Sequence, residues 1–308
     1  MLEGLKVVEL ATYIAAPGAG GIMADWGAEV VKIEPPKGDP MRRFFDTLGT
    51  DFDTNPVFDL DNRGKRGVVL DITRPEGLEA ALKLVAGADV FLTNVRPAAL
   101  KRAGLDWDSL KTGNPRLIYC SLTGYGLQGP DADKPGMDVA SFWSRSGVGA
   151  ITAPKGTDPF PIRTGMGDHV CSLATVSAIL AAVVERARTG KGRLVETSLM
   201  RAGVYSIGSD MAIQLGLGKL ASTRPRENAV QPLANFFRAA DGRWFNILVR
   251  QGGADWPGIA AAAGKAELVD DERFSSSRAR RENGPALVAE LDAGFAALPY
   301  EEIARRLD

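Results

Sequence analysis

The sequence is poor in the residues that build metal sites and disulfide frameworks. It has one histidine, His169, and two cysteines, Cys120 and Cys171, among 308 residues. A single histidine excludes a multi-histidine metal site and severely limits Ser-His-Asp catalysis. Both cysteines lie in apolar sequence surroundings, which predicts two reduced, buried thiols in a cytoplasmic protein, and nothing supports cysteine catalysis.

An excess of charge of either sign is also lacking. The chain has 37 basic and 38 acidic residues and a net charge of −1, whereas a nucleic-acid-binding protein needs a basic surplus. The start, MLEGLKVVEL, lacks a basic region followed by an apolar core, and no uninterrupted apolar run reaches membrane-crossing length. We therefore expect no nucleic acid partner, no membrane span and no secretion.

The chain is 45% hydrophobic and long enough for two cores. In the first half, short β-rich runs alternate with helical runs. Strands are predicted at 6–10, 28–34, 67–71, 89–94 and 117–122, with helices at 18–26 and 75–86. This βαβ rhythm predicts an α/β fold with a doubly wound, Rossmann-like parallel sheet.

The second half predicts a long apolar helix at 170–187, a strand at 193–197 and a helix from 199 to about 215. Residues 216–232 are rich in glycine, proline and polar side chains, which is typical of a linker. We expect a large domain at 1–215 and a smaller α+β domain at 233–308. In the smaller domain, Asp241-Gly242 predicts a hairpin between 235–237 and 243–249, and helices follow at 255–263, 285–297 and 300–308.

Asp168 is the most informative candidate site residue. It follows Gly165 and Gly167 and directly precedes the predicted apolar helix. A helix N-terminus favours an ionised carboxylate, and the glycines allow a ligand to approach the backbone closely. Because aspartate is also a common helix-capping residue, this motif alone favours a structural role.

A glycine-rich segment follows the first strand, at Pro17-Gly18-Ala19-Gly20-Gly21, and Glu34 ends the next strand. A dinucleotide-binding turn has this layout, but its third glycine is replaced here by Met23, so a nicotinamide cofactor is a minor alternative. The segment predicts either a phosphate-binding helix N-terminus or tight helix–sheet packing.

Basic residues gather in two further segments, 62–66 (NRGKR) and a loop from Asn94-Val95-Arg96-Pro97 to Lys101-Arg102. Either could be solvated surface. Basic loops in one half of a near-neutral protein nonetheless suggest a bound polyphosphate, and coenzyme A has that charge pattern.

Together these segments closely resemble the class III coenzyme A transferases. This family includes formyl-CoA transferase, the carnitine-related CoA-transferases and α-methylacyl-CoA racemase. The resemblance covers nearly the whole chain in order, over residues 2–42, 62–71, 94–107, 117–130, 165–200 and 234–248.

The resemblance implies roles for particular residues. Asp168 matches the nucleophile that forms acyl anhydride and aspartyl-CoA thioester intermediates, and Asp138 matches an acidic residue that orients it. Ile14 stands where formyl-CoA transferases carry a glutamine, which disfavours an oxalate- or formate-sized substrate. Backbone amides around Gly165 and Gly167 are candidate oxyanion donors. The expected coenzyme A contacts are Ile14, Ala15, Lys65, Asn94 and Arg102, with Arg42 and Lys37 as less certain phosphate contacts.

Met137 separates the two reaction types of the family. Racemases pair an aspartate with a histidine from a Gly-His-Asp motif, because returning an α-proton requires a base on each face of the substrate. In this chain the motif is Gly136-Met137-Asp138. His169 is a poor substitute, since adjacent helical side chains point about 100° apart.

We therefore expect a CoA-transferase acting on an acyl-CoA and a carboxylic acid, with coenzyme A as substrate and no tightly bound cofactor. An α-methylacyl-CoA racemase and an inactive acyl-CoA-binding protein remain alternatives. The resemblance further implies an interlocked homodimer and a chain that continues beyond residue 308. Phe142-Trp143 could line an acyl pocket, but core packing is the simpler expectation.

Overall fold

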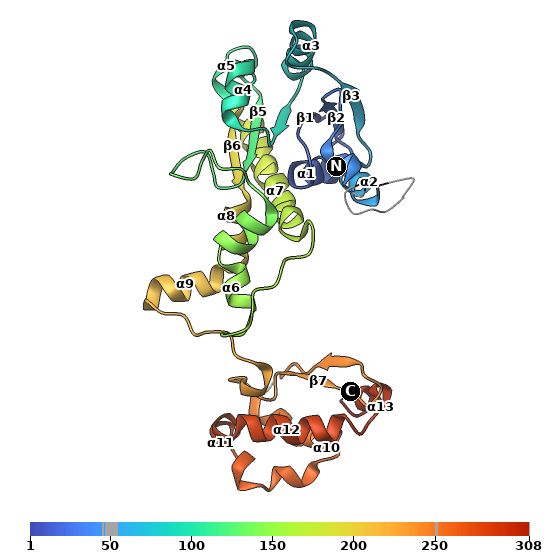
Figure 1. The fold of residues 1–308 in the computed structure, drawn as a ribbon, viewed down its shortest axis with the longest axis vertical. Helices are drawn as coiled ribbons and strands as arrows, with labels where there is room; N and C mark the ends of the chain where they lie inside the picture. Colours follow the sequence, from blue (N-terminus) through green and yellow to red (C-terminus); the bar gives the residue numbers. More distant parts are fainter. Residues whose placement is uncertain (45, 47–54, 250–251, 308) are drawn as a thin grey trace. The chain divides into compact units, whose positions relative to one another are not determined.

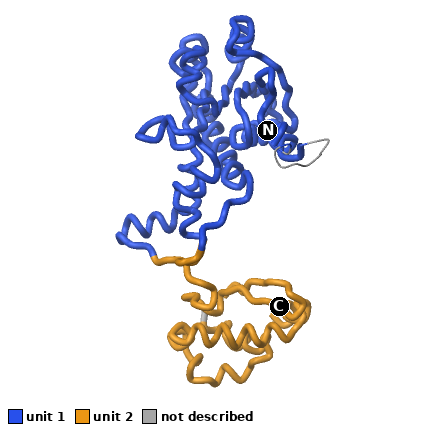
Figure 2. The backbone as a smooth tube through the Cα atoms, viewed as in Figure 1, with its two compact units in different colours: residues 1–152, 158–220 blue, residues 153–157, 221–308 orange. Residues whose placement is uncertain are grey.

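The computed structural model describes residues 1–44, 46, 55–249 and 252–307. The chain divides into two compact units, one of residues 1–152 and 158–220 and one of residues 153–157 and 221–308 (Figure 2). The linker predicted at 216–232 spans the point at which the chain passes from the first unit to the second.

The first unit is built on a six-stranded parallel sheet with the order β3-β2-β1-β4-β5-β6 (Figure 1). Strands that are covered on both faces are rich in apolar residues, and this is why the runs could be found in the sequence. The expected α/β sheet is confirmed. Its strands are β1 (Lys6–Leu10), β2 (Glu29–Glu34), β3 (Arg66–Val69), β4 (Val90–Thr93), β5 (Ile118–Thr123) and β6 (Arg193–Ser198).

Helices surround this sheet, and two differ from the expectation. The segment from 94 to 102 is not a loop throughout, because Pro97 begins a helix whose first position suits proline. The single helix expected at 199–215 is broken at Ile207. The helices and turns are α1 (Ala15–Asp25), η1 (Pro40–Arg43), α2 (Pro56–Asn62), α3 (Pro75–Ala86), α4 (Pro97–Ala103), α5 (Trp107–Leu110), the π-helix η3 (Asp138–Arg145), α6 (Val148–Thr152), α7 (Met166–Thr189), α8 (Leu199–Ser206) and α9 (Gly208–Leu217).

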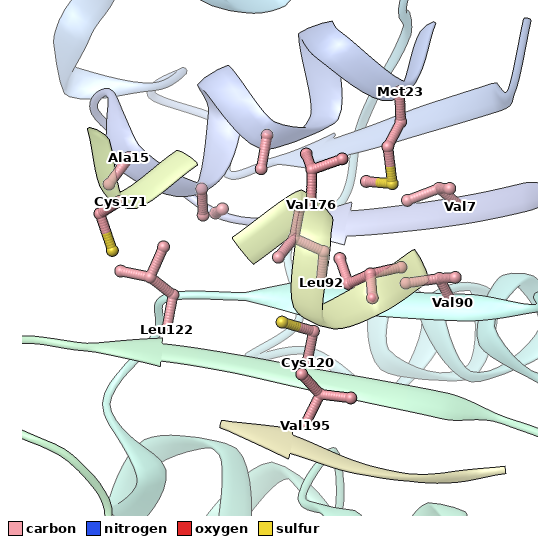
Figure 3. Packing of buried hydrophobic residues seen from close by; sticks show 14 of the residues in the cluster. Val7, Ala15, Met23, Val90, Leu92, Cys120, Leu122, Cys171, Val176 and Val195 are labelled. Atoms are coloured by element: carbon pink, nitrogen blue, oxygen red, sulfur yellow. The ribbon is translucent and has the colours of Figure 1, made fainter. Parts of the chain in front are cut away.

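Successive strand residues point to opposite faces of the sheet. Val7 packs with α1 and α7, while Val8 packs with the cluster that includes Ala81 and Val85 of α3. Figure 3 shows the first cluster, in which the two cysteines are buried. Both thiols are free and buried, as expected, and burial raises the pKa of the Cys171 thiol to about 12.

Helix α7 bears on the expectation of no membrane span. Among the described residues it is the one helix long and apolar enough to cross a membrane by length and composition. However, it packs against α1, and its Cys171, Val176 and Ile179 lie in the core of the first unit. Its apolar composition is therefore that of a core helix.

The sequence suggested that the glycines at 18, 20 and 21 form the turn after the first strand. In the structure they lie inside α1. A Cβ at Gly18 would lie 2.6 Å from Ser172 Oγ, and one at Gly20 would lie 2.0 Å from Glu9 Oε2. These glycines allow close packing on the sheet and on α7, which favours the packing alternative. Glu34 accepts two hydrogen bonds from Arg42, both of 2.8 Å.

The second unit is smaller and has its own aromatic core around Phe237, Trp256, Phe274 and Phe295. Its hairpin turns at Asp241-Gly242, where Gly242 has a φ of +84°, as the sequence predicts. The elements are η4 (Arg226–Asn228), β7 (Phe236–Arg238), β8 (Trp244–Asn246), η5 (Gly252–Asp255), α10 (Trp256–Ala262), η6 (Ala266–Val269), η7 (Glu272–Phe274), α11 (Ser277–Glu282), α12 (Gly284–Phe295) and α13 (Tyr300–Leu307).

Candidate active site

A cavity of about 340 Å³ opens in the first unit at the carboxyl ends of β1, β4, β5 and β6. The strand order reverses between β1 and β4, and open α/β sheets bind ligands at such a switch point. The residues that line the cavity include Tyr13, Ile14, Ala15, Met41, Asn94, Arg96, Leu122, Lys134, Met137, Asp138, Ile162, Asp168 and Leu199.

Asp168 reaches the cavity from the first turn of α7. The helix begins at Met166, four residues earlier than expected, after Gly165 in a left-handed conformation with a φ of +75°. The expected position of Asp168 at a helix N-terminus is therefore confirmed. No side chain caps the helix, so Asp168 is not its N-cap residue.

The charge state of Asp168 differs from the expectation. Burial and, to a smaller extent, the Asp138 and Asp61 charges raise the pKa of the Asp168 carboxyl to about 7, while His169 opposes the rise. The helix N-terminus does not keep this carboxylate ionised, because the amides there serve another acid. The Gly167 N–H donates to Asp138 Oδ2 at 3.2 Å.

Asp138 lies at the start of η3 and also lines the cavity. Burial raises its pKa, although the amides of Gly167, Asp168 and Gly165 oppose that rise. Asp138 is therefore the acid held against the start of α7. The Gly167 N–H donates to Asp138, so Gly167 is not a free oxyanion donor in this structure.

Gly167 has no room for a side chain. A Cβ there would lie 2.2 Å from Phe142 Cγ and 2.3 Å from Asp138 Oδ1. Phe142 and Trp143 are buried in the core and do not line the cavity, which confirms the packing interpretation. The close contact of glycine with Phe142 fixes the spacing between α7 and η3.

The loop after β1 carries backbone strain that the sequence did not reveal. Tyr13 has a φ of +67° and is the one non-glycine residue with a positive φ among the described residues, a conformation that costs about 1–3 kcal/mol. Its N–H donates to Asp39 Oδ1 at 3.1 Å, and Lys32 Nζ lies 2.9 Å from Asp39 Oδ2. These contacts hold the loop that presents Ile14 and Ala15 to the cavity.

Only some of the residues expected to contact coenzyme A line the cavity. Asn94 lines the cavity and holds the β1 exit through two hydrogen bonds to the Thr12 backbone, of 3.0 and 2.8 Å. Lys65 is buried instead, and its ammonium donates to Glu9, Asn62 and the Pro17 carbonyl. It has no donor left for a ligand in this structure.

The cationic side chains at the cavity are also not those expected. Arg102 is exposed on α4, Lys37 is exposed, and Arg42 is paired with Glu34, and none of the three lines the cavity. Arg96 and Lys134 line it instead. Arg96 lies within the basic segment described in the sequence analysis. A basic residue shortly after the end of a strand was the signal that could have identified it as a cavity residue.

Met137 lines the cavity and is 54% exposed. Its thioether sulfur is only a weak acceptor and has no pKa near neutral pH, so it cannot serve as a general base. Among the described residues, no group of three or more histidine, cysteine or acidic side chains could hold a metal ion. The carboxyl groups that line the cavity are those of Asp138 and Asp168.

Comparisons with known proteins agree on one family. Residues 2–308 match the family model of CoA-transferase family III. The chain is 38% identical over 282 residues to (R)-2-hydroxy-4-methylpentanoate CoA-transferase of Clostridioides difficile, covering 90% of this chain and 69% of that protein. It is 35% identical over 280 residues to cinnamoyl-CoA:phenyllactate CoA-transferase of Clostridium sporogenes, covering 89% and 68% respectively.

A solved structure of a CAIB/BAIF family protein from Brucella suis shares the fold, with a TM-score of 0.89. The two chains are 33% identical, and the match covers 99% of this chain and 81% of that one. The fold of both units is thus one that occurs in this family.

Asp168→Asn should stabilise the protein above neutral pH. The raised pKa means that the folded state holds a proton on Asp168 more tightly than the unfolded chain does. The wild-type protein therefore loses stability from this group as pH rises from about 4 through about 7. We expect the variant to gain at least about 1 kcal/mol at pH 8, roughly 2–4 °C in Tm, and little at pH 4.5.

Thermal unfolding of both proteins at pH 4.5 and 8 checks this expectation. Asp108→Asn is the matched control, since Asp108 has a side chain that is 79% exposed. Equal pH dependence in wild type and Asp168→Asn would mean that burial does not hold a proton on Asp168.

Proposed function

The chain belongs to CoA-transferase family III, and we propose that it moves coenzyme A from an acyl-CoA to a carboxylic acid through an aspartyl-CoA thioester on Asp168. One observation carries the proposal. Asp168 presents a carboxyl with a pKa of about 7 to a cavity at the carboxyl ends of the strands. Substantial fractions of both the ionised nucleophile and its conjugate acid are then present at neutral pH.

In the first half of the cycle, an Asp168 carboxylate oxygen attacks the thioester carbonyl. The carbon–sulfur bond breaks, and a mixed anhydride and the coenzyme A thiolate form. The thiolate then attacks the aspartyl carbonyl, the first acid leaves as a carboxylate, and Asp168 carries coenzyme A as a thioester.

The second half reverses these steps with a new acid. The acceptor carboxylate attacks the aspartyl carbonyl, and the thiolate leaves and then attacks the new acyl carbonyl. Asp168 is released as a carboxylate. No water is consumed, so the thioester bond is conserved. Water must therefore be excluded from the anhydride, and the apolar wall of the cavity suits that requirement.

Asp138 fits a positioning role in this cycle. It binds the Gly167 amide and so fixes the first turn of α7, from which Asp168 projects. Its nearby charge also raises the pKa of Asp168. A carboxylate with a raised pKa is the more nucleophilic one once it is ionised, because nucleophilicity rises with basicity.

The lining of the cavity supports a particular class of acid. Ile14, Met41, Leu122, Ile162 and Leu199 give it an apolar wall, and Ile14 offers no amide to a small polar acid. Two similar proteins are named for 2-hydroxy-4-methylpentanoate and phenyllactate. We propose that the acid bears a branched aliphatic or aromatic side chain, and that Arg96 and Lys134 bind the coenzyme A phosphates.

A second copy of the chain is part of the proposal. Helix α9 buries none of its residues, and Ile213, Leu215 and Leu217 on it are exposed, as is Tyr205 on α8. Apolar side chains on an unburied helix favour a partner. The homodimer implied by the family resemblance would cover them, and sedimentation that gave only the monomer mass at micromolar concentration would contradict it.

Incubation with an acyl-CoA should leave a covalent adduct on Asp168. The experiment mixes the purified protein with 4-methylpentanoyl-CoA, cinnamoyl-CoA and succinyl-CoA in turn, quenches with acid, and measures intact and tryptic peptide masses. We expect an added acyl group or coenzyme A on the peptide of residues 164–186 with the first two compounds.

Asp168→Asn is the matched control, because asparagine is nearly isosteric with aspartate. It should form no adduct and transfer no coenzyme A, while its affinity for coenzyme A stays within a few-fold of wild type. Adducts on another peptide, or normal turnover by the variant, would disprove the nucleophile assignment.

Two neighbouring arginines test the coenzyme A site. Arg96 lines the cavity and Arg102 does not, although both belong to one basic segment. Arg96→Ala should raise the apparent KM for acyl-CoA by about tenfold, because a lost charged hydrogen bond of about 1.5 kcal/mol acts on ground and transition states alike. Arg102→Ala should change KM by less than about twofold. Steady-state kinetics of the two variants measure these changes. A larger rise in KM for Arg102→Ala than for Arg96→Ala would restore the assignment of Arg102 to coenzyme A made from the sequence.

A further inference from the structure

The single histidine of the chain makes one contact that the proposed reaction does not use. His169 Nε2 lies 3.0 Å from Asp61 Oδ1 on α2. The Asp61 side chain is 2% exposed, and its other oxygen, Oδ2, has no hydrogen-bond partner among the described residues. An isolated buried carboxylate is costly unless it is paired.

The pairing favours the protonated, cationic form of His169. The hydrogen bond to Asp61 raises the pKa of His169, the charges of Asp61, Asp168 and Asp138 raise it further, and burial opposes them. Lys65 is the other cation that senses the Asp61 charge, but its own hydrogen bonds go to Glu9, Asn62 and Pro17. His169 is therefore the hydrogen-bonded countercharge of Asp61.

The fold brings this pair close to the candidate nucleophile. His169 follows Asp168 in the first turns of α7, and Asp61 reaches it beside α1. A Cβ at Gly18 of α1 would lie 3.3 Å from Asp61 Oδ1, so the absence of a side chain there leaves room for the Asp61 carboxylate. The ring also packs close to Gly165, where a Cβ would lie 3.4 Å from His169 Cε1.

The charges around Asp168 are unbalanced without this histidine. Asp138 and Asp61 both disfavour the ionised form of Asp168, and among the described residues His169 is the charged side chain that favours it. Three carboxyl groups, Asp61, Asp138 and Asp168, thus interact electrostatically with one histidine. Its loss would leave the nucleophile beside negative charge only.

We propose that His169, held by Asp61, is a positioning residue that supplies the countercharge for the Asp168 carboxylate and so sets how much of the nucleophile is ionised at working pH. The kinetic part of this inference rests on the proposed transferase function. The electrostatic part does not, because Asp168 can be titrated without any substrate.

His169→Gln and His169→Arg form a matched pair that separates charge from shape. The Asp168 carboxyl is followed by ¹³C NMR of protein labelled at the aspartate carboxyl carbons, and it is assigned by its absence in Asp168→Asn. We expect the Asp168 midpoint to rise by about one pH unit in His169→Gln, since the neutral amide removes the cation. In His169→Arg it should stay at or below the wild-type value.

The pH profile of transfer gives the second readout. Only ionised Asp168 attacks, so kcat/KM should rise with pH through the Asp168 midpoint. In His169→Gln that limb should move upward, which makes kcat/KM about tenfold lower at pH 6 and within about threefold of wild type at pH 8.5. His169→Arg should retain the wild-type limb. Arg188→Gln, at the exposed far end of α7, is the control that should change nothing.

The outcomes are distinguishable. The inference is overturned if the Asp168 titration midpoint is the same in His169→Gln as in the wild-type protein. It is also overturned if the midpoint shifts but the pH dependence of kcat/KM does not. Absence of transfer by the wild-type protein with every acyl-CoA defeats the proposed function, and the NMR midpoints still decide the role of His169. If His169→Gln fails to fold, Asp61→Asn/His169→Gln replaces both partners with neutral amides. The midpoint should rise in this double variant too, by a smaller amount, and no rise would overturn the inference.

Discussion

Burial of the Asp168 carboxyl determines the arrangement of the groups around it. Removing a carboxylate from water raises its pKa, and here the value reaches about 7. The helix N-terminus that could have compensated donates to Asp138 instead, so Asp168 remains readily protonated. His169, which is hydrogen-bonded to Asp61, opposes this rise. Both the neutral and the ionised form of Asp168 are then present at neutral pH, and the ionised form is the one that attacks in the proposed cycle.

A second buried charge cluster shapes the other wall of the cavity. Glu9 binds Lys32 at 3.0 Å and Lys65 at 2.8 Å, and Lys32 also binds Asp39. Asp39 in turn accepts from the strained Tyr13 amide. Buried ion pairs contribute little net stability compared with apolar packing. Here the cluster fixes the loop after β1 in a conformation that presents Ile14 and Ala15 to the cavity.

Much of the fold could be predicted because parallel strands such as Val90–Thr93 are short apolar runs. Helix α3 likewise begins at Pro75, the residue at which the sequence predicts a helix to begin. The sequence did not predict helix α4, because its seven residues, Pro97–Ala103, are too few to show a helical pattern of apolar side chains. The family resemblance implied a coenzyme A contact for Lys65, and only the structure shows Glu9 beside it. The pKa of Asp168 likewise depends on Asp138 and Asp61, 30 and 107 residues away in sequence, so no local pattern reveals it.

Oxygen labelling tests the covalent role of Asp168 most directly. The protein is incubated with an acyl-CoA donor and a carboxylic acid acceptor carrying ¹⁸O in both carboxyl oxygens, in ordinary water. The bridging oxygen of the second anhydride comes from the acceptor, so it should remain on Asp168 when the product leaves. We predict a mass increase of 2 Da, and of 4 Da after many turnovers, in the peptide of residues 164–186. Product formation with no ¹⁸O in that peptide would contradict the account.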